Sequence, residues 1–394
     1  MKTIITNGKL ILKDQLLEGY DIILAGDRIE SICPSGQKEQ ENVQIYDAKG
    51  SYVMPGIIDT HSDMIESYIQ PRSTAIMDFE MGLKEAEKVL AGCGITTMFH
   101  SISMYKEGTW DVKEIRQAPQ VKKLASLVAG YRHEERLIRH RYHLRYEIDN
   151  VSCYDDVLDM IKKGYVDLLS FMDHTPGQGQ YKNLEIYRKH QKNGGKDMTE
   201  EEFQKLVQSE MEKEVITMEQ LKAAAELAKS MGIAVASHDD DTIEKLELNE
   251  QLGVSISEFP ITMEVAKAAR KKGYRTVVGA PNILLGGSHS GNLSAMEAIR
   301  ENAADILVSD YYPQALLQAV FQLFEKEGIP VWEAVRYVTL NPAMATGLDE
   351  SLGSLEEGKM ADLLIVRSKE GHPVLEKVFV SGECILNCNY RRAD

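Results

Sequence analysis

Short apolar runs of strand length alternate with longer amphipathic runs through the middle of the chain. Eight of the short runs end in polar side chains or lead directly to them: 56–61, 94–100, 143–147, 166–173, 232–238, 254–258, 276–280 and 304–310. The amphipathic runs between them have helical spacing, as at 83–90, 218–231 and 262–271. Such alternation predicts a parallel sheet covered by helices, and eight units favour a closed barrel.

Both ends of the chain carry a different pattern, in which short strands are separated by turns. Strands are expected at 3–5, 10–12, 20–24 and 29–32, and again at 361–366 and 374–380. Neither set is large enough to form a stable domain alone. We therefore predict an α/β fold in which residues 55–344 form a TIM-like (β/α)8 barrel that carries the catalytic site. Residues 1–54 and 345–394 are expected to combine into one small β-sandwich.

The composition limits the class of protein. Hydrophobic residues make up 43% of the 394 residues, which suits a large core, and no apolar run reaches the roughly 18 residues of a membrane span. The polar start of the chain is not typical of a signal peptide, so we expect a cytoplasmic protein. Five scattered cysteines indicate no disulfide framework. The net charge of −16 argues against nucleic-acid or membrane partners but leaves a small anionic substrate open.

Six imidazole and carboxylate side chains lie at the predicted ends of barrel strands: His61, Asp63, Glu147, His174, His238 and Asp310. Residues two apart on a strand share a face, so His61 and Asp63 can reach one ion together. Because barrel enzymes keep their chemistry at this end, we predict one or two divalent ions of zinc, iron, manganese or nickel type. Glu147 is the natural bridge between two ions. Asp310 can also take a proton from the attacking water.

Each of these residues has a plainer explanation when it is taken singly. A lone histidine is more often a core or loop residue, and a carboxylate at a strand end could simply pair with a nearby arginine. Repetition along successive strands favours the metal centre instead. We expect His133, His140 and His143 to lie away from it, beside a basic helix and the start of a strand. His100, at the end of a predicted strand, could line the pocket without binding metal.

A glycine-rich loop at 286–293 follows the seventh predicted strand, and a helix is expected to begin near its end. Glycines let backbone N–H groups approach a ligand closely, so the loop suits phosphate. It lacks the Gly-Lys-Ser/Thr of a Walker loop, and an ordinary flexible loop is the alternative. The substrate-binding residues predicted here are Asn282, Ser288, His289, Ser290 and Asn292.

Three motifs resemble the amidohydrolase superfamily: Pro55-Gly56-Ile57-Ile58-Asp59-Thr60-His61, Asn341-Pro342-Ala343 and Gly358-Lys359-Met360-Ala361-Asp362-Leu363. One position departs from the superfamily pattern, because most members carry histidine where this chain has Asp63. That departure argues against ordinary amide hydrolysis. Further motifs resemble the phosphonate-metabolism branch of the superfamily: 61–63, Glu147, His174, 237–241, 258–262, 279–282, 286–292 and 309–313.

The resemblance to that branch implies hydrolysis of α-D-ribose 1-methylphosphonate 5-triphosphate to the 5-phosphate and pyrophosphate, within carbon–phosphorus bond cleavage. Arg72, Arg145 and Lys182 are expected to neutralise the leaving pyrophosphate. Lys182 lies in a long polar segment, 177–214, which is either a solvated insertion or a lid. The alternatives are a hydrolase that cuts a C–N bond and a barrel without catalytic function. The expected partner is a small phosphorylated molecule, and a homodimer is left open.

The strand numbering leaves one question. The superfamily usually draws its two later metal-binding histidines from the fifth and sixth barrel strands. Here His174 follows the fourth predicted strand, and His238 ends the fifth. Either the barrel contains a further strand between His100 and His143, or one later strand is an extra.

Overall fold

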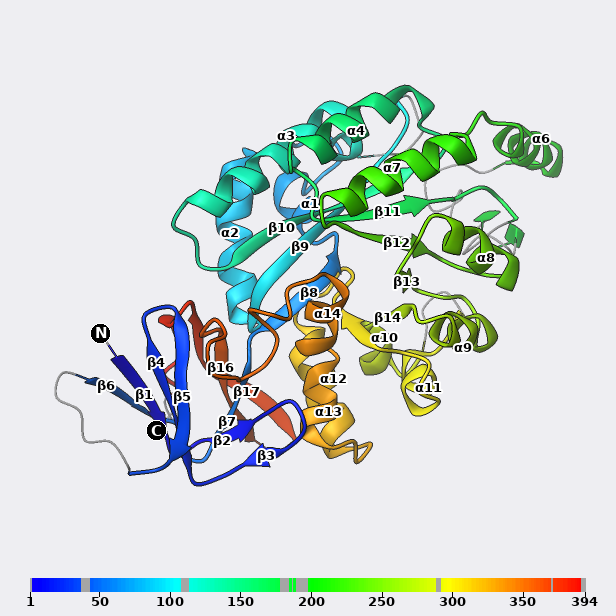
Figure 1. Cartoon of the computed structure of the whole chain (residues 1–394). Coiled ribbons are helices and arrows are strands. Elements are labelled where there is room, and N and C mark those ends of the chain that lie inside the picture. Colours follow the sequence, from blue (N-terminus) through cyan, green and yellow to red (C-terminus); the bar gives the residue numbers. More distant parts are fainter. Residues whose placement is uncertain are drawn as a thin grey trace.

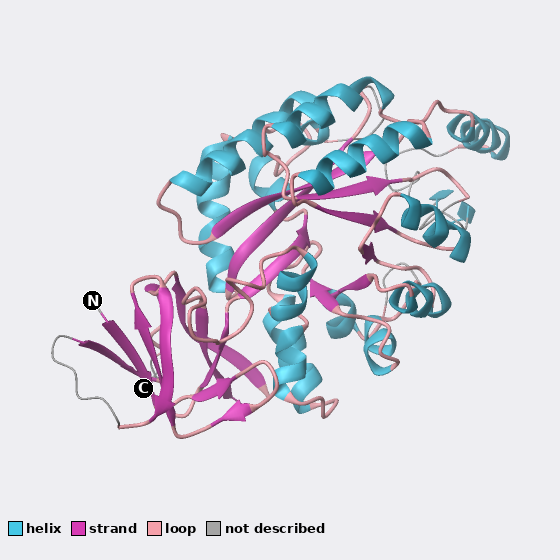
Figure 2. Ribbon diagram, in the orientation of Figure 1, coloured by secondary structure: helices cyan, strands magenta, loops and turns pink. Residues whose placement is uncertain are grey.

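The structure is a computed structural model, and it describes residues 2–36, 43–107, 113–177, 184–185, 187–188, 198–287, 292–369 and 371–390. It contains an eight-stranded sheet surrounded by helices and, beside it, two smaller sheets built from both ends of the chain (Figure 1). Figure 2 shows the same division, with helices on the outside of the large sheet and almost none on the smaller ones.

The large sheet is a parallel barrel whose strands follow one another in chain order. Its strands are β8 (Ile57–Ser62), β9 (Ile95–Met104), β10 (Arg139–Glu147), β11 (Leu168–Met172), β12 (Ala234–His238), β13 (Ile256–Glu258), β14 (Arg275–Gly279) and β15 (Ile306–Val308). All eight predicted strands are confirmed, as is the fold class. Because β10 pairs directly with β9 and β11, the barrel has no further strand between them. His174 therefore follows the fourth strand, and His238 ends the fifth.

The first and last strands close the barrel at its carboxyl end. The backbone N–H of Asp310 donates to the carbonyl oxygen of His61 at 3.0 Å, and the N–H of Asp63 donates to the carbonyl oxygen of Asp310 at 2.9 Å. These bonds form a parallel bridge between Ser62 and Asp310. Barrel closure therefore places His61 and Asp63, the first predicted ligands along the chain, beside Asp310, the last one.

Helices cover the outside of the barrel. The longer ones are α2 (Phe79–Gly92), α3 (Ala118–Gly130), α4 (Tyr154–Lys162), α6 (Glu200–Met211), α7 (Met218–Ser230), α8 (Ile243–Gln251), α9 (Met263–Lys271) and α12 (Ala315–Glu325). The shorter ones are α1 (Ile65–Ile69), α10 (Ala280–Leu285), α11 (Ala295–Arg300), α13 (Val331–Arg336), α14 (Leu340–Ala345), η1 (Glu114–Arg116), η2 (Tyr131–His133) and η3 (Val151–Cys153). The predicted helices at 218–231 and 262–271 are confirmed. Thr217 and Thr262 cap them, each accepting a hydrogen bond from a backbone N–H of the first turn.

Two apolar layers lie on either side of the barrel wall. The larger core packs the helices against the outer face of the strands. A smaller cluster includes side chains inside the barrel, among them Ile58, Phe99, Leu168, Ile256 and Val277. In β8 and β13 these residues precede the polar side chains that end the strands, His61 and Glu258, and in β9 and β11 they precede Ser101 and Ser170. The lower part of the barrel is therefore filled, and the polar site is confined to its mouth.

The two smaller sheets form the β-sandwich expected from both termini. One contains β5 (Arg28–Pro34), β4 (Tyr20–Ala25), β1 (Lys2–Thr6) and β6 (Val43–Asp47), in that order. The other contains β18 (Glu383–Asn387), β17 (His372–Val380), β16 (Leu363–Lys369), β7 (Tyr52–Pro55), β2 (Lys9–Ile11) and β3 (Leu16–Leu17). Ile5, Ile22, Val53, Leu363 and Phe379 share one buried cluster between them. The domain boundaries at 54/55 and 344/345 stay a prediction.

Gly56 marks the point where the chain passes from the sandwich into the barrel. It separates β7, which pairs with β16, from β8, the first barrel strand. A Cβ atom on Gly56 would lie 2.2 Å from Oγ1 and 2.5 Å from Cγ2 of Thr96 on the neighbouring strand. Only glycine allows this close approach without displacing the Thr96 side chain.

The five cysteines are free thiols, in agreement with the absence of a disulfide framework in the sequence. Among the described residues, no helix combines the length and the apolar composition needed to cross a membrane.

Candidate metal centre

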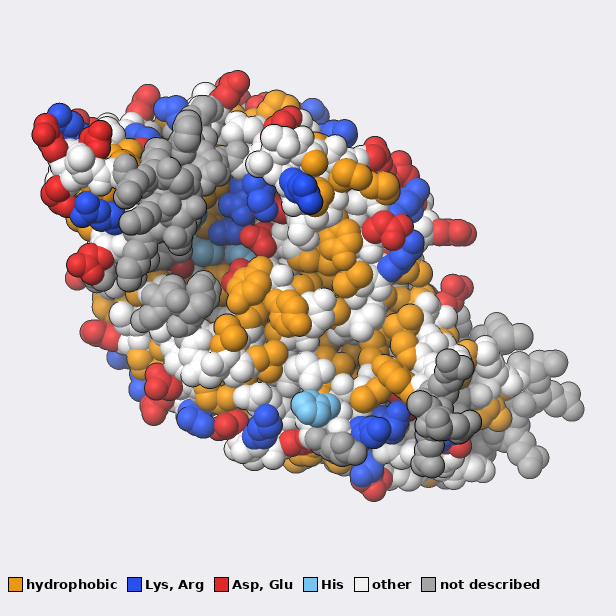
Figure 3. Space-filling model, turned by 180° about the vertical axis from the view of Figure 1, so that it is seen from behind, with side chains coloured by type: hydrophobic (Ala, Val, Ile, Leu, Met, Phe, Trp, Pro, Cys, Tyr) orange, Lys and Arg blue, Asp and Glu red, His pale blue; other side chains and the backbone are white. Residues whose placement is uncertain are grey.

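The barrel mouth is hollowed and lined by ionisable side chains. Figure 3 shows a hollow with histidine side chains at its floor and Lys and Arg side chains beside them. Five of the six predicted metal ligands lie in or beside strands β8, β10, β12 and β15, and His174 lies in the loop that follows β11. The site is therefore built from the carboxyl ends of five barrel strands.

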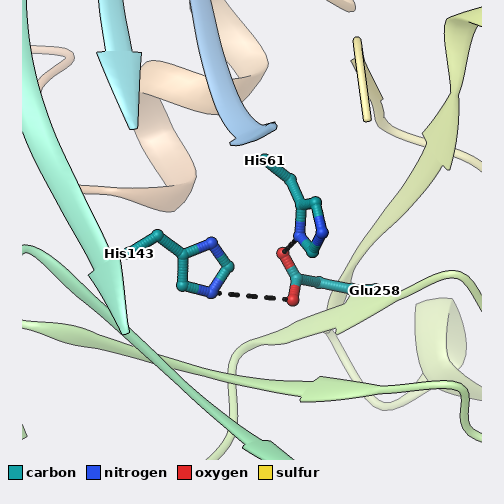
Figure 4. A group of neighbouring side chains, drawn as sticks. All are labelled: His61, His143 and Glu258. Carbon is teal, nitrogen blue, oxygen red and sulfur yellow. Dashed lines mark hydrogen bonds and ion pairs between the residues drawn. The ribbon is translucent and has the colours of Figure 1, made fainter. Parts of the chain in front are cut away.

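His61, at the end of β8, contacts a carboxylate that the sequence had not suggested. Its Nδ1 lies 2.8 Å from Oε1 of Glu258, the last residue of β13 (Figure 4). Both side chains are at most 1% exposed. An ionised carboxylate can only accept a hydrogen bond, so this contact favours the tautomer that has its proton on Nδ1 and its lone pair on Nε2. Burial and then the nearby Arg145 guanidinium hold the pKa of His61 well below its usual value.

His143 lies inside the barrel, and the expectation that it would be remote from the site was wrong. Strand β10 begins at Arg139, so His143 is in mid-strand rather than at its start. The side-chain period of two then places His143, Arg145 and Glu147 on the same inner face. Nδ1 of His143 lies 2.9 Å from Oγ of Ser101, and Nε2 contacts Oγ of Ser170. Burial lowers the pKa of His143 to about 3.

His174 and Glu147 form a second imidazole–carboxylate pair. Nδ1 of His174 lies 2.9 and 3.1 Å from the two carboxylate oxygens of Glu147. The ring also stacks on Tyr105, with 6.3 Å between centroids and 5° between planes. Although burial disfavours the charged ring, the Glu147 carboxylate raises the pKa of His174. Glu147, predicted to bridge two ions, thus lies beside a second predicted ligand.

His238 forms a third pair with the residue that follows it. Nδ1 of His238 lies 3.1 Å from Oδ2 of Asp239. Neighbours on a strand normally point to opposite faces, but Asp239 has a φ of 51°, which turns its carboxylate back towards the ring. Nε2 of His238 lies 3.5 Å from a guanidinium nitrogen of Arg145. Asp239 is a residue of the site that the sequence reasoning missed.

Arg145 lies among the predicted ligands. Besides its contact with His238, its positive charge acts against protonation of His61, Asp63, His143 and His174. Its buried Nε atom has no hydrogen-bond partner among the described residues. A guanidinium donor in this position suits an incoming phosphate oxygen.

Asp63 is paired with an arginine from the loop after the second strand. Its Oδ2 lies 3.3 Å from a guanidinium nitrogen of Arg116, whose Nε contacts Glu66 at 2.5 Å. Lys113 lies 3.0 Å from the other oxygen of Glu66. Burial, followed by the charge of Glu66, raises the pKa of Asp63 to about 6. Arg116 and Lys113 therefore add positive charge beside the mouth that sequence motifs did not reveal.

Asp310 follows β15 and is half-buried at the seam of the barrel. Its φ of 59° lies in the left-handed region, which costs free energy for a residue other than glycine. The two backbone bonds to β8 hold it there. A strained backbone that is fixed by its neighbours is common where a side chain must be aimed precisely at a reacting group.

The predicted substrate-binding residues other than Arg145 do not gather at one place in the described structure. Arg72 is exposed in the loop after α1. Asn282, in α10, accepts from the N–H of Ala295 at 3.0 Å and donates to the carbonyl of Leu293 at 3.4 Å, so it fixes the chain after the glycine-rich loop. Asn292 is half-buried at the start of that segment. The predictions for Lys182, Ser288, His289 and Ser290 fall outside the described residues.

His100 packs outside the barrel, so the prediction that it lines the pocket was wrong. Strand β9 continues to Met104, and His100 is therefore in mid-strand. Its inner-face neighbour is Ser101, which contacts His143. Nε2 of His100 instead contacts Nδ1 of His140 at 2.8 Å, and Nε2 of His140 contacts Glu87 of α2 at 3.2 Å.

The donor set fits a divalent metal. Three imidazoles have their Nδ1 atoms beside carboxylates, and Asp63 and Asp310 lie at the adjoining seam. Imidazole nitrogen and carboxylate oxygen together suit zinc, iron, manganese or nickel. Among the described residues, the group whose ligand atoms all lie within 4.8 Å of one another is a deeper one, made of His61, His143 and Glu258; no three of the six predicted ligands lie as close together. The two groups share His61.

Comparisons with known proteins agree with this geometry. The sequence profile of the amidohydrolase family matches residues 52–385. The alpha-D-ribose 1-methylphosphonate 5-triphosphate diphosphatase of Escherichia coli (strain K12) is 31% identical over 97% of this chain and 100% of its own. An N-acetylglucosamine-6-phosphate deacetylase from Pasteurella multocida has the same fold, with a TM-score of 0.66 at 13% identity, covering 98% and 99% of the two chains. An enamidase gives a TM-score of 0.64 at 18% identity, covering 98% and 96%.

The profile match includes the first barrel strand and continues through β16 and β17 of the sandwich. The fold, the ligand-bearing strand ends and the extent of the match lead to the same conclusion. This chain belongs to the amidohydrolase family.

Proposed function

We propose that this protein hydrolyses α-D-ribose 1-methylphosphonate 5-triphosphate to the 5-phosphate and pyrophosphate, in phosphonate catabolism. The main structural observation behind this proposal is the position of Arg145. A guanidinium among imidazoles that are proposed to bind metal suits an anionic substrate. The full-length similarity to the Escherichia coli diphosphatase supports the same reaction. Asp63, where most amidohydrolases carry histidine, is consistent with a reaction other than amide hydrolysis.

We assign the metal to the imidazoles of His61, His174 and His238, with Asp63, Glu147 and Asp310 as the carboxylates near it. When bound, a divalent ion supplies Lewis acidity that activates water and offsets phosphate charge. The protein's own contribution is to hold the donors rigidly. Each imidazole lies on or just after a barrel strand, with its Nδ1 beside a carboxylate.

Asp310 is the proposed general base. It lies at the closing seam, where backbone bonds to His61 and Asp63 limit its movement. A carboxylate in this position takes a proton from water as the new bond to the α-phosphorus forms, while the bond to the pyrophosphate oxygen breaks. The pyrophosphate leaves as an anion, so positive charge matters more than protonation at that end.

Arg145 and Arg116 supply that positive charge. Arg145 lies inside the mouth, and Arg116 lies beside it on η1, next to Lys113. These cations lie among carboxylates, because Arg116 and Lys113 are paired with Asp63 and Glu66. A bound divalent metal would add the positive charge that the mouth needs to attract a triphosphate. Arg72 and Lys182 remain further candidates for contacts with the phosphate chain.

Phosphorus NMR of the reaction with the ribosyl triphosphate tests the proposal. Pyrophosphate and the 5-phosphate should appear together in equal amounts, and only when a divalent metal is present. Hydrolysis of a C–N bond is the second candidate, since a dihydroorotase of Staphylococcus epidermidis is 33% identical over 22% of this chain. Turnover of a cyclic amide without any release of pyrophosphate would replace the first proposal by the second.

A further inference from the structure

The three histidines of the proposed site share one arrangement, in which a carboxylate lies beside Nδ1. The pairs and their distances are His61–Glu258 at 2.8 Å, His174–Glu147 at 2.9 Å and His238–Asp239 at 3.1 Å. In the last pair the two atoms lie close together but do not form a hydrogen bond. An imidazole that donates from Nδ1 keeps its lone pair on Nε2. Metal-binding histidines commonly have such a partner, which fixes both the tautomer and the orientation of the ring.

Glu258 is the most firmly held of the three carboxylates. It ends β13, is fully buried, and accepts a hydrogen bond from Oγ of Ser170 at 2.9 Å on Oε2. Its other oxygen, Oε1, accepts from His61. Its backbone is paired with that of His238 in the barrel register. The carboxylate is thus anchored by side chains of β8 and β11, two strands that do not adjoin β13, before any ligand binds.

We propose that Glu258 is a positioning residue that holds Nδ1 of His61, so that His61 binds the metal through Nε2, and that Glu258 is not itself a ligand. This inference rests on the proposed function only in taking His61 as a metal ligand. It assigns a role to a buried carboxylate that the reaction itself does not use.

The competing arrangement is a deeper metal held by His61, His143 and Glu258 together. The contacts of His143 argue against it. Its Nδ1 is within 2.9 Å of Oγ of Ser101 and 3.1 Å of the carbonyl oxygen of Thr60, and its Nε2 contacts Ser170. Both ring nitrogens are therefore engaged by protein oxygens. A metal at this depth would have to displace those contacts and also the Ser170 bond of Glu258.

The tautomer of His61 can be measured in the metal-free protein. Protein labelled with 15N-histidine gives long-range proton–nitrogen correlations that distinguish the protonated ring nitrogen from the unprotonated one. The His61→Gln variant identifies the His61 signals by their loss. We expect the proton on Nδ1, and we expect Glu258→Ala to convert His61 to a mixture of tautomers. A proton on Nε2 in the native protein would overturn the proposal.

Metal affinity supplies a second readout that does not depend on activity. Competition with a chelator for zinc should show binding about 10–100-fold weaker in Glu258→Ala. The isosteric Glu258→Gln should recover part of this loss, because its amide oxygen can still accept from Nδ1. A Glu258→Gln variant as weak as Glu258→Ala, with less metal per chain, would mean that Glu258 is a direct ligand.

Two further variants complete the test. Glu87→Gln is the control, since Glu87 is also a carboxylate beside an imidazole, Nε2 of His140, but lies outside the barrel. The zinc affinity of this variant should equal that of the native protein. His143→Gln should also retain zinc. A loss in His143→Gln as large as that in His61→Gln would place the metal in the deeper group and reject the inference. Neither readout involves the triphosphate, so a failure of the proposed reaction would leave the result for Glu258 intact.

Discussion

The backbone N–H of Asp310 donates to the carbonyl oxygen of His61 at 3.0 Å, joining the last barrel strand to the first. Two residues proposed for the same reaction are thereby fixed by main-chain bonds rather than by flexible side chains alone. The positive φ of Asp310 belongs to the same arrangement, because the seam imposes it. The geometry of the proposed base thus depends on barrel closure.

Replacing Asp310 by Asn should abolish most of the turnover. The amide keeps the size of the side chain but cannot accept the proton, and a general base typically contributes about 10²–10⁴-fold in rate. Phosphorus NMR gives the rate, and elemental analysis of the purified variant should show that most of the metal is retained. A variant that turns over at nearly the native rate would exclude Asp310 as the base.

Removing the charge of Arg145 should weaken recognition of the triphosphate. A hydrogen bond to a charged group contributes about 1.5–3 kcal/mol, so Arg145→Gln should lower kcat/KM by about tenfold or more. Metal affinity should not fall, because a cation is being removed from beside the ligands. Arg141→Gln is the control, since Arg141 lies on the same strand but pairs with Asp167. Equal losses in both variants would argue against a specific contact.

Chelation of the metal should lower the thermal midpoint, which re-addition should restore. A ligand that binds only the folded protein stabilises it by about 4 kcal/mol at a thousand times its dissociation constant. The metal-dependent shift should shrink in His61→Gln and stay complete in His133→Gln, whose histidine is exposed on η2. Equal shifts in both variants would place the stabilising metal elsewhere.

Gly56→Ala should destabilise the fold by about 1–3 kcal/mol, because its Cβ would overlap the side chain of Thr96. Thr96→Ala removes the two closest atoms, so the double variant should be more stable than the sum of the single changes implies. Chemical denaturation measures each free energy of unfolding. Gly92→Ala, where nothing lies within 4 Å of the added Cβ, is the control. Strict additivity would show that the predicted overlap does not occur.

The contact between Lys13 and Glu356, which joins the two terminal segments of the chain, should make a contribution to stability that depends on pH. Hydrogen bonds from Lys13 and then Ser354 lower the pKa of Glu356 to about 2, against an ordinary value of 4.5. A carboxyl group whose pKa is lower in the folded protein stabilises the fold at pH values above its ordinary pKa. This stabilisation is lost as the pH falls towards 2. Because the group is partly exposed, screening limits the effect to about 1 kcal/mol.

Glu356→Gln should therefore be less stable than the native protein at pH 7, and the difference should narrow between pH 5 and pH 3. Urea unfolding at several pH values measures it. Glu350→Gln, at an exposed position, controls for the change in net charge. A difference that stays constant over this range would mean that the ion pair contributes nothing that depends on pH.

The sequence correctly predicted those features of the fold that a local pattern along one strand or helix determines. The alternation of strands and helices, the Thr262 cap and the polar ends of β10, β12 and β13 are local signals, and the structure confirms those elements. Strand length was harder to judge. His143 and His100 were misplaced because β10 begins earlier and β9 ends later than their apolar cores indicated. A shift of a few residues changes which face of a strand a histidine occupies.

Other features of the site depend on contacts that no local pattern contains. Glu258 meets His61 across the barrel, and Arg116 reaches Asp63 from a loop. Asp239 adjoins a predicted ligand in sequence, but its role follows from a left-handed φ that residue type does not determine. These contacts arise only when eight strands close into a barrel. The strand-end residues could be predicted, whereas the network that holds them could not.

The release of pyrophosphate is the most direct measurement of the central claim. The metal-loaded protein is incubated with α-D-ribose 1-methylphosphonate 5-triphosphate, and its products are followed by phosphorus NMR beside those of Asp310→Asn. The account predicts pyrophosphate and the 5-phosphate in equal amounts from the native protein, and almost none from the variant. No pyrophosphate from the native protein, or equal amounts from both proteins, would contradict it.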